Sequence, residues 1–278
     1  MGEAGTVRVG VHLPQYGRVA GPEAVLRAAR HAEELGFADL WVSDHVVHPA
    51  AQDYPSPYLL DPLVTLSWAA AVTSRIGLGT SVLVVPMHNP LELANTLASL
   101  DALSSGRLTI GVGVGWSAPE YAALGRDFPT RGRRLEEAMD LFRAVWTQDP
   151  VTFHGRFTSF DDIRVLPKPA HPIPIWVGGR SEVAYRRAVE RGDGYQAVGL
   201  APEEAAPIVA RLRRDRPEES WPISLRTGWD PLGMDPNRIV EERAAFAEAG
   251  IQHVVSAPWR RELDDWLRAM DRLAELVL

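Results

Sequence analysis

The stretch Leu108-Thr109-Ile110-Gly111-Val112-Gly113-Val114-Gly115-Trp116 begins as a short apolar run and ends in alternating glycines. Three other apolar runs, over residues 38–42, 76–80 and 174–177, end comparably, at Ser43-Asp44-His45, Ser81-Val82 and Gly178-Gly179-Arg180-Ser181. Each run is short enough for a buried strand, and a helical pattern follows it directly or after a loop. Polar residues and glycines gathered at strand ends are typical of a parallel barrel, which carries its site on the C-terminal face.

Strand-like and helix-like runs alternate along the whole chain. We predict strands over residues 7–13, 39–43, 76–82, 107–112, 175–177, 195–198, 223–227 and 253–256. The helices that follow them are predicted over residues 22–35, 61–73, 90–103, 132–147, 181–191, 202–214, 237–248 and 262–276. Eight such units predict a (β/α)8 barrel that forms a single domain over residues 1–278.

Residues 149–172 interrupt this alternation. Apolar residues flank a turn at His154-Gly155-Arg156, as they do in a β-hairpin. Because this segment joins a helix to a strand, we expect it toward the N-terminal face of the barrel. Packing or oligomer contacts are the expected role there, rather than catalysis.

The composition bounds the possible functions. The 278 residues are 46% hydrophobic and 23% charged, a balance typical of soluble globular chains. Cysteine is absent, which excludes disulfides, thiolate nucleophiles and cysteine metal ligands. The formal net charge is -7 with the arginines spread along helices, so we expect no nucleic-acid partner. Residues 1–10 lack the apolar core of a secretion signal and no stretch suits a membrane span, so we expect a cytoplasmic protein without membrane contact.

His45 directly follows a predicted strand and is preceded by Asp44. An imidazole at a barrel mouth can transfer protons near neutral pH, and an adjacent carboxylate can orient it. The alternative is that Asp44 caps the following turn and His45 only fills space. The features at the other strand ends favour a functional role for His45.

Gly178-Gly179-Arg180-Ser181 predicts a phosphate site. Two glycines followed by a serine helix cap supply free N–H groups at the positive end of a helix dipole. Arg180 adds a charged clamp. A plain capped turn would explain Ser181 but not the double glycine. Gly113-Val114-Gly115 would let a flat ligand or a phosphate approach the main chain, although a tight turn also needs glycine.

Other catalytic motifs are absent. No histidines have the spacing of a metal site, and the sequence contains no Gly-x-Ser-x-Gly elbow, Walker loop or Rossmann fingerprint. We therefore expect no bound metal and no serine nucleophile. His12 lies inside the first predicted strand, where we expect a hydrogen-bonded core role.

Four motifs, taken in order, resemble the luciferase-like monooxygenase superfamily: Trp41-Val42-Ser43-Asp44-His45, Gly79-Thr80-Ser81-Val82, residues 111–116 and Trp176-Val177-Gly178-Gly179. Further similarity lies at residues 119–125, 131–137 and 166–169, and the resemblance covers residues 7–199 in register. It implies a (β/α)8 barrel of the bacterial luciferase type, with insertions, that binds FMN or the deazaflavin coenzyme F-420 at its C-terminal mouth.

The Asp44-His45 pair and the following Val46-Val47-His48-Pro49 resemble the F-420-dependent oxidoreductase branch more closely. By position, the resemblance places Asp44 and His45 beside the cofactor ring, and it implies a non-proline cis peptide at Ser81–Val82 that backs the ring. We expect the following residues to bind the cofactor: Asp44, Ser81, Val82, Gly113, Val114, Gly178, Gly179, Arg180 and Ser181.

Trp116 marks a departure from the sugar-phosphate dehydrogenases of this branch, which carry a glutamate at the corresponding position after the Gly-x-Gly. The resemblance therefore supplies no catalytic acid there. Glu120 lies nearby, and helix capping or solvation is the alternative to a role in the site. We expect Trp116 and Glu120 to contact the substrate.

These observations predict an F-420-dependent oxidoreductase that moves a hydride between the deazaflavin and a small organic substrate, with His45 donating or accepting the proton. The alternatives are an FMN-dependent monooxygenase, a flavin-binding protein without turnover and a phosphosugar isomerase barrel. The helices predicted over residues 61–73 and 90–103 are apolar on more than one side, which, with the resemblance, predicts a homodimer.

Overall fold

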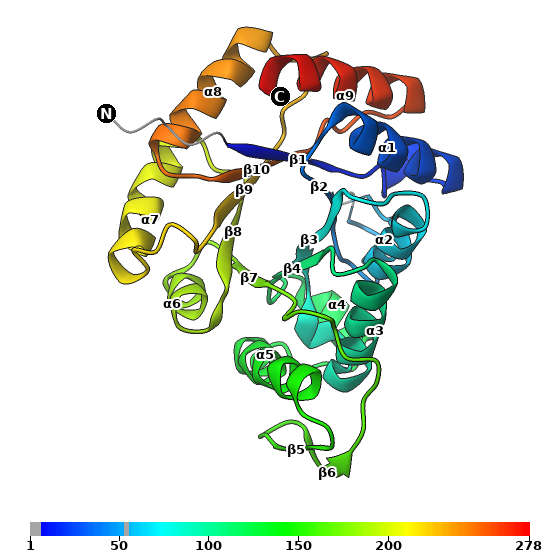
Figure 1. The fold of residues 1–278 in the computed structure, drawn as a ribbon, viewed down its shortest axis with the longest axis vertical. Coiled ribbons are helices and arrows are strands. Elements are labelled where there is room, and N and C mark those ends of the chain that lie inside the picture. Colours follow the sequence, from blue (N-terminus) through cyan, green and yellow to red (C-terminus); the bar gives the residue numbers. More distant parts are fainter. Residues whose placement is uncertain (1–6, 53–55) are drawn as a thin grey trace.

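The computed structural model describes residues 7–52 and 56–278, and within them a closed barrel of eight parallel strands (Figure 1). Around the barrel the strand order is β1-β10-β9-β8-β7-β4-β3-β2, so the first and last strands of the chain pair with each other. The (β/α)8 barrel predicted from the sequence is confirmed. The eight strands are β1 (Arg8–His12), β2 (Asp39–Val42), β3 (Gly77–Leu83), β4 (Leu108–Val112), β7 (Ile175–Gly178), β8 (Gly194–Val198), β9 (Ile223–Thr227) and β10 (His253–Ser256).

Helices surround the barrel, and local sequence explains where several of them begin. Asp61 and Asn89 accept hydrogen bonds from the first-turn N–H groups of α2 and α3, and a proline follows each of them. The helices are α1 (Pro22–Leu35), α2 (Pro62–Ala70), α3 (Pro90–Leu103), α4 (Ala118–Ala123), α5 (Arg131–Thr147), α6 (Glu182–Arg191), α7 (Pro202–Asp215), α8 (Pro236–Glu248) and α9 (Leu263–Val277), with short 3-10 turns at η1 (Gly17–Val19) and η2 (Val85–Met87). The short helix α4 lies between the strand predicted over residues 107–112 and the helix predicted over residues 132–147, where no helix was predicted.

Glycines inside the strands make room for two tryptophans in the barrel interior. A Cβ on Gly79 would lie 2.6 Å from the Trp41 ring, and one on Gly194 would lie 2.6 Å from Trp176. The two indoles stack with ring centroids 5.5 Å apart and are almost fully buried. The barrel is therefore a packed core, and a ligand can only bind at its ends.

The hairpin of β5 (Val151–His154) and β6 (Ser159–Ile163) lies beyond α5, away from the barrel (Figure 1). The prediction that the hairpin lies toward the N-terminal face is wrong for the turn at residues 154–158. Glu137, near the start of α5, accepts hydrogen bonds from the N–H groups of Arg156, Phe157 and Thr158, at 2.6 to 3.0 Å. Because the start of α5 follows the C-terminal end of β4, this carboxylate draws the turn back toward the C-terminal face.

The predicted helices and strands otherwise match the structure to within a few residues. Among the described helices, none is long and apolar enough to cross a membrane. The prediction that residues 1–10 carry no secretion signal concerns a segment of which residues 1–6 lie outside the described part of the chain.

Candidate functional site

The C-terminal ends of β3, β4 and β7 meet around Val82. The Ser81–Val82 peptide bond is cis, as the resemblance implied. A Cβ on Gly113 would lie 2.6 Å from one methyl group of Val82, and a Cβ on Gly178 would lie 2.7 Å from the other. Packing against Val82 therefore explains both glycines, and the half-buried Val82 forms part of the floor of the barrel mouth.

His45 pairs with Glu120, which approaches from the short helix α4. Nδ1 of His45 lies 2.9 Å from Oε2 of Glu120, and the imidazole is 13% exposed. The other carboxylate oxygen accepts hydrogen bonds from the N–H groups of Val46, at 2.7 Å, and Val47, at 3.3 Å. Burial alone would raise the pKa of Glu120, but the hydrogen bonds from His45 and from these N–H groups lower it below its usual value.

Asp44 does not orient His45, contrary to the interpretation of the Asp44-His45 pair. Its Oδ2 accepts hydrogen bonds from the N–H of Val84 and from Nε2 of His88, each at 2.8 Å. Burial acts to lower the pKa of His88, and the hydrogen bond to Asp44 outweighs it and raises the pKa. Asp44 thus ties the segment after β2 to the segment after β3. Consecutive side chains along a chain in extended conformation point in opposite directions, which explains the separate partners of Asp44 and His45.

His48, three residues after His45 in the sequence, is a second histidine at the mouth. Its ring lies 5.4 Å from that of His45, and both of its nitrogens are buried without a hydrogen-bond partner. Burial, and then the neighbouring His45, lower the pKa of His48. His48 therefore remains the neutral neighbour, whereas the carboxylate of Glu120 orients His45.

Arg226, on β9, was missed in the sequence and reaches the same mouth. Its Nη1 donates to Oγ of Ser43 at 2.6 Å and to the carbonyl of Ser81. Ser43 in turn lies 2.9 Å from Nε2 of His12, whose Nδ1 donates to the carbonyl of Leu13. Burial, and then the charge of Arg226, lower the pKa of His12 to about 3, so this histidine is neutral. The core role expected for His12 agrees with this geometry, and an arginine inside the apolar run of β9 was the available sign of Arg226.

The segment Gly178–Ser181 leads into α6. Oγ of Ser181 accepts from the N–H of Ala184 at 3.2 Å, and the hydroxyl of Tyr195 donates to the carbonyl of Gly179 at 2.8 Å. The N–H groups of Glu182 and Val183, in the first turn of α6, have no acceptor within the helix. Gly179, Arg180 and Ser181 are exposed to solvent. This fixed turn with outward N–H groups fits a cofactor phosphate.

Trp116 follows the β4 glycines and stands at the edge of the mouth. It is 57% exposed, and its ring meets that of His45 edge-on at 5.7 Å. The carbonyl of Val114 accepts a hydrogen bond from the hydroxyl of Tyr121 at 2.7 Å, which ties the strand end to α4. Trp116 therefore places an apolar surface beside His45 at the edge of the mouth.

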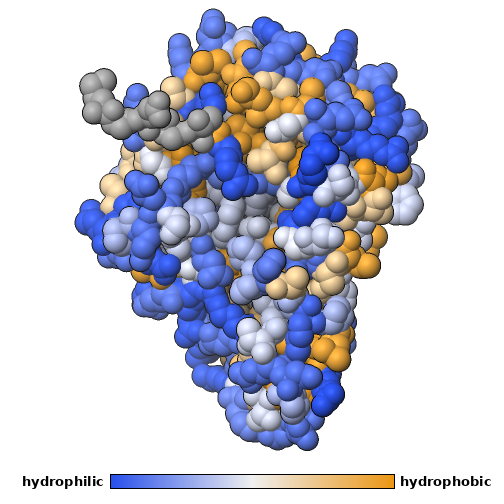
Figure 2. Space-filling view, in the orientation of Figure 1, coloured by the Kyte–Doolittle hydropathy of each residue, from blue (hydrophilic) through white to orange (hydrophobic). Residues whose placement is uncertain are grey.

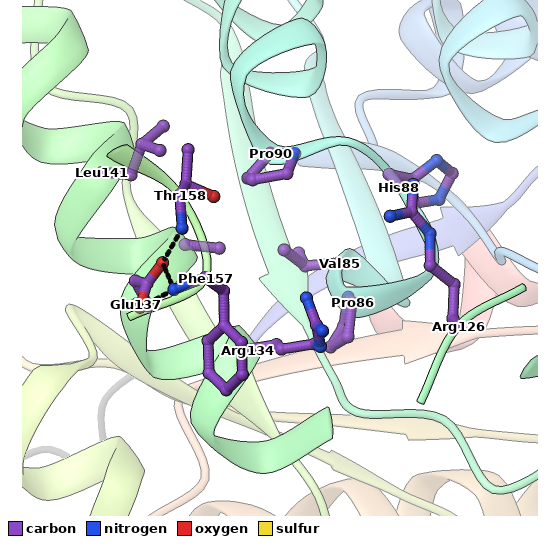
Figure 3. Close-up of a pocket in the computed structure, with 11 residues that line it drawn as sticks. Val85, Pro86, His88, Pro90, Arg126, Arg134, Glu137, Leu141, Phe157 and Thr158 are labelled. Carbon is purple, nitrogen blue, oxygen red and sulfur yellow. Dashed lines mark hydrogen bonds between the residues drawn. The ribbon is translucent and has the colours of Figure 1, made fainter. Parts of the chain in front are cut away.

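A separate cavity lies between η2, α5 and the turn of the hairpin (Figure 3). Figure 3 shows Arg134 beside Phe157, and Glu137 with its hydrogen bonds to Phe157 and Thr158. The cavity measures about 30 Å³, whereas ligand pockets usually measure about 300–1,000 Å³. This cavity is therefore too small to hold a cofactor.

Asp39, His253 and Ser224 form a chain of hydrogen bonds in the order of a hydrolase triad. His253 lies 2.8 Å from Asp39 through Nε2 and 2.6 Å from Ser224 through Nδ1. All three are buried, and Asp39 and Ser224 lie near the N-terminal ends of their strands. The group is therefore structural. Among the described residues, no three histidine or carboxylate side chains converge as a metal site requires.

The model of the family described as luciferase-like monooxygenase matches residues 5–228. The chain belongs to this family. It is 33% identical over 263 residues to a Mycobacterium tuberculosis protein without an assigned function, an alignment that covers 89% of this chain and 91% of the relative.

Two relatives have dehydrogenase activities assigned to them. The chain is 39% identical over 171 residues to an F-420-dependent glucose-6-phosphate dehydrogenase of Kineococcus radiotolerans, covering 60% of this chain and about half of that enzyme. It is 34% identical over 182 residues to the Amycolatopsis mediterranei enzyme of the same name, covering 63% of this chain and 53% of that enzyme. The expected resemblance to F-420-dependent oxidoreductases is confirmed.

Solved structures confirm the fold of the bacterial luciferase type. An F-420-dependent secondary alcohol dehydrogenase superposes with a TM-score of 0.82 at 21% identity, covering 98% of both chains. An EDTA monooxygenase from Chelativorans superposes with a TM-score of 0.80 at 14% identity, covering 98% of this chain and 93% of that one. At these identities the structures establish the shared fold.

Proposed function

We propose that this protein is an oxidoreductase that binds coenzyme F-420 at the barrel mouth and transfers a hydride between it and a small organic substrate. The observation that carries the proposal is that an oriented histidine and a glycine-rich turn, capped by Ser181 at the start of α6, stand at the same end of the barrel. Ligands of (β/α)8 enzymes bind at this end.

The residues at the mouth have different roles, which follow from their positions. Gly178, Gly179, Arg180 and Ser181 hold the phosphate through main-chain N–H groups and one guanidinium. Val82, supported by Gly113, backs the cofactor ring, while Asp44, Ser81 and Val114 hold the strand ends that shape the ring site. When bound, F-420 supplies the hydride chemistry.

His45 carries the proton step. Movement of a hydride to or from an alcohol, imine or alkene carbon requires a proton to leave or join the substrate, and the imidazole of His45 is the group at the mouth that would exchange it. Its pairing with Glu120 leaves Nε2 for the substrate. The exposed ring of Trp116 lies edge-on to His45 and offers an apolar surface to the substrate.

The choice of F-420 over FMN is supported by the Asp44-His45 motif and by the dehydrogenase relatives, which use F-420 by name. The second candidate, an FMN-dependent monooxygenase, is favoured by the superposition on the EDTA monooxygenase. The two differ in chemistry, because a deazaflavin transfers hydride whereas reduced FMN activates oxygen.

An activity assay separates the two candidates. Oxidised F-420 would be mixed with the protein and a panel of small secondary alcohols and sugar phosphates without oxygen, and the loss of deazaflavin absorbance followed. We expect substrate-dependent bleaching, which His45→Ala should slow by roughly 10²–10⁴-fold. Oxygen uptake with reduced FMN and no bleaching of F-420 would favour the monooxygenase, and binding without either reaction would indicate a flavin-binding protein.

A further inference from the structure

We propose that Glu120 is a positioning residue that fixes the tautomer of His45, with the proton on Nδ1 and the lone pair on Nε2. This extends the proposed function, since it assigns the state in which His45 meets the substrate. Nothing in the sequence separated this role from a substrate contact or from a helix-capping role for Glu120.

The hydrogen-bond inventory at Glu120 sets the tautomer. An ionised carboxylate only accepts hydrogen bonds, so the group that faces its Oε2 must donate. Nδ1 of His45 lies 2.9 Å from this oxygen and therefore carries the proton. Nε2 of the same ring makes no hydrogen bond with any described residue, so in the neutral imidazole it is an acceptor that remains for the substrate.

The same carboxylate fixes the backbone that carries His45. Oε1 accepts the N–H groups of Val46 and Val47, so Glu120 holds three donors from three successive residues. The side chain of Glu120 is fully buried, which strengthens each of these bonds by excluding water. The position of Glu120 is itself fixed, because its own N–H donates to the Ser117 side chain at the start of α4.

Glu120→Gln separates the tautomer from the backbone contacts. The amide oxygen of glutamine can still accept from Val46 and Val47, whereas its NH2 group would face His45. Nδ1 must then accept, and the proton moves to Nε2. The substitution keeps the shape of the side chain and reverses the polarity of the nitrogen that meets the substrate.

Nitrogen-15 NMR of histidine-labelled protein reads the tautomer without cofactor or substrate. The His45 signals are assigned by their loss in His45→Asn, and spectra are taken at mildly alkaline pH, where imidazoles are neutral. We expect the Nδ1–H form in the wild-type protein and the Nε2–H form in Glu120→Gln. The Nε2–H form in the wild-type protein overturns the proposal whether or not the variant folds. An unchanged tautomer in a folded Glu120→Gln also overturns it.

Glu33→Gln is the matched control. Glu33 likewise accepts backbone N–H groups from three successive residues, Ser74, Arg75 and Ile76, but it does not contact His45. We expect this variant to keep the wild-type tautomer and turnover.

Turnover gives the second readout. At saturating F-420 we expect Glu120→Gln to lose at least about tenfold, since the wrong tautomer of a catalytic histidine can cost up to about 10⁴-fold. Equal turnover with an inverted tautomer would contradict the positioning role. If the wild-type protein shows no hydride transfer, the proposed function fails, while the tautomer measurement still stands on its own.

Discussion

At the residue scale, two carboxylates and two histidines at the barrel mouth form crossed pairs. Glu120 pairs with His45, and Asp44 pairs with His88. Each pair joins segments far apart in the sequence. Each carboxylate therefore orients an imidazole and also holds two of the loops at the mouth together. The site is therefore built by contacts between the segments that follow β2, β3 and β4.

His45→Ala tests the chemistry of the site at this scale. We expect turnover to fall by roughly 10²–10⁴-fold, the usual contribution of general acid–base catalysis, with cofactor affinity almost unchanged. Steady-state rates at saturating F-420, compared with titrated affinity, measure the two effects separately. If the imidazole only stacks on the ring, affinity falls and saturating cofactor restores turnover.

His12 predicts how stability depends on pH. The pKa of His12 is about 3 in the folded protein, whereas an unperturbed histidine has a pKa of 6.5. Between these two pH values the unfolded chain therefore binds one more proton at His12 than the folded chain does. Stability therefore decreases as pH falls from about 6.5 toward about 3, by at most about 1.4 kcal/mol per pH unit from this group.

Urea unfolding of the wild-type protein and His12→Asn at several pH values between 4 and 7 measures this contribution. The free-energy cost of His12→Asn should be largest at neutral pH and shrink in acid. A cost that stays constant with pH would contradict the assignment of a neutral, buried His12.

At the element scale, the start of α6 is the proposed site for the cofactor phosphate. Gly179 has φ of +133°, and a Cβ there would lie 2.7 Å from the Cβ of Ala184. A substitution of Gly179 would therefore disturb folding as well as binding. Arg180 is a cleaner target, because its side chain is 53% exposed and its polar contacts with described residues are the carbonyl of Gly199 and, at 3.6 Å, Glu204.

Arg180→Glu should weaken F-420 binding by about tenfold or more, since it replaces a charge-assisted hydrogen bond with repulsion. The free energy of unfolding should change by no more than about 0.5 kcal/mol, as for most exposed substitutions. Arg186→Glu, farther along α6, is the control and should leave affinity unchanged. Equal affinities for both variants would place the phosphate elsewhere.

The elements themselves were largely predictable from the sequence, because hydrophobic period and capping residues are local. For example, α1 begins at Pro22 and ends before Gly36, which takes the left-handed conformation common at helix ends. The turn of the hairpin was not predictable, because Glu137 holds it through hydrogen bonds that cross about twenty residues. The partners of Asp44 and His45 were missed for the same reason, since pairing in space leaves no pattern in a single sequence.

At the scale of the whole molecule, α2 presents apolar side chains to solvent. Val64 is 68% and Trp68 is 49% exposed. In Figure 2, hydrophobic surface lies on the side of the molecule where Figure 1 places α2 and α3. The surface is smaller than the sequence suggested, because most of the apolar residues of these helices are buried within the chain: Leu63, Leu66, Ala69, Leu93, Leu97 and Leu100.

We predict a homodimer in which the exposed face of α2 is buried. Light scattering at micromolar concentration should give twice the chain mass, and Val64→Glu should shift it toward the monomer. Val240→Glu, a similar change on the exposed side of α8, should leave the mass unchanged. A monomer mass for the wild-type protein would contradict the prediction.

The whole account depends on which cofactor enters the barrel mouth. The most direct measurement is a titration of the purified protein with F-420 and with FMN under the same conditions, followed by the fluorescence of each cofactor. The account predicts one F-420 per chain and an affinity for F-420 higher than that for FMN. Equal or tighter binding of FMN would contradict it.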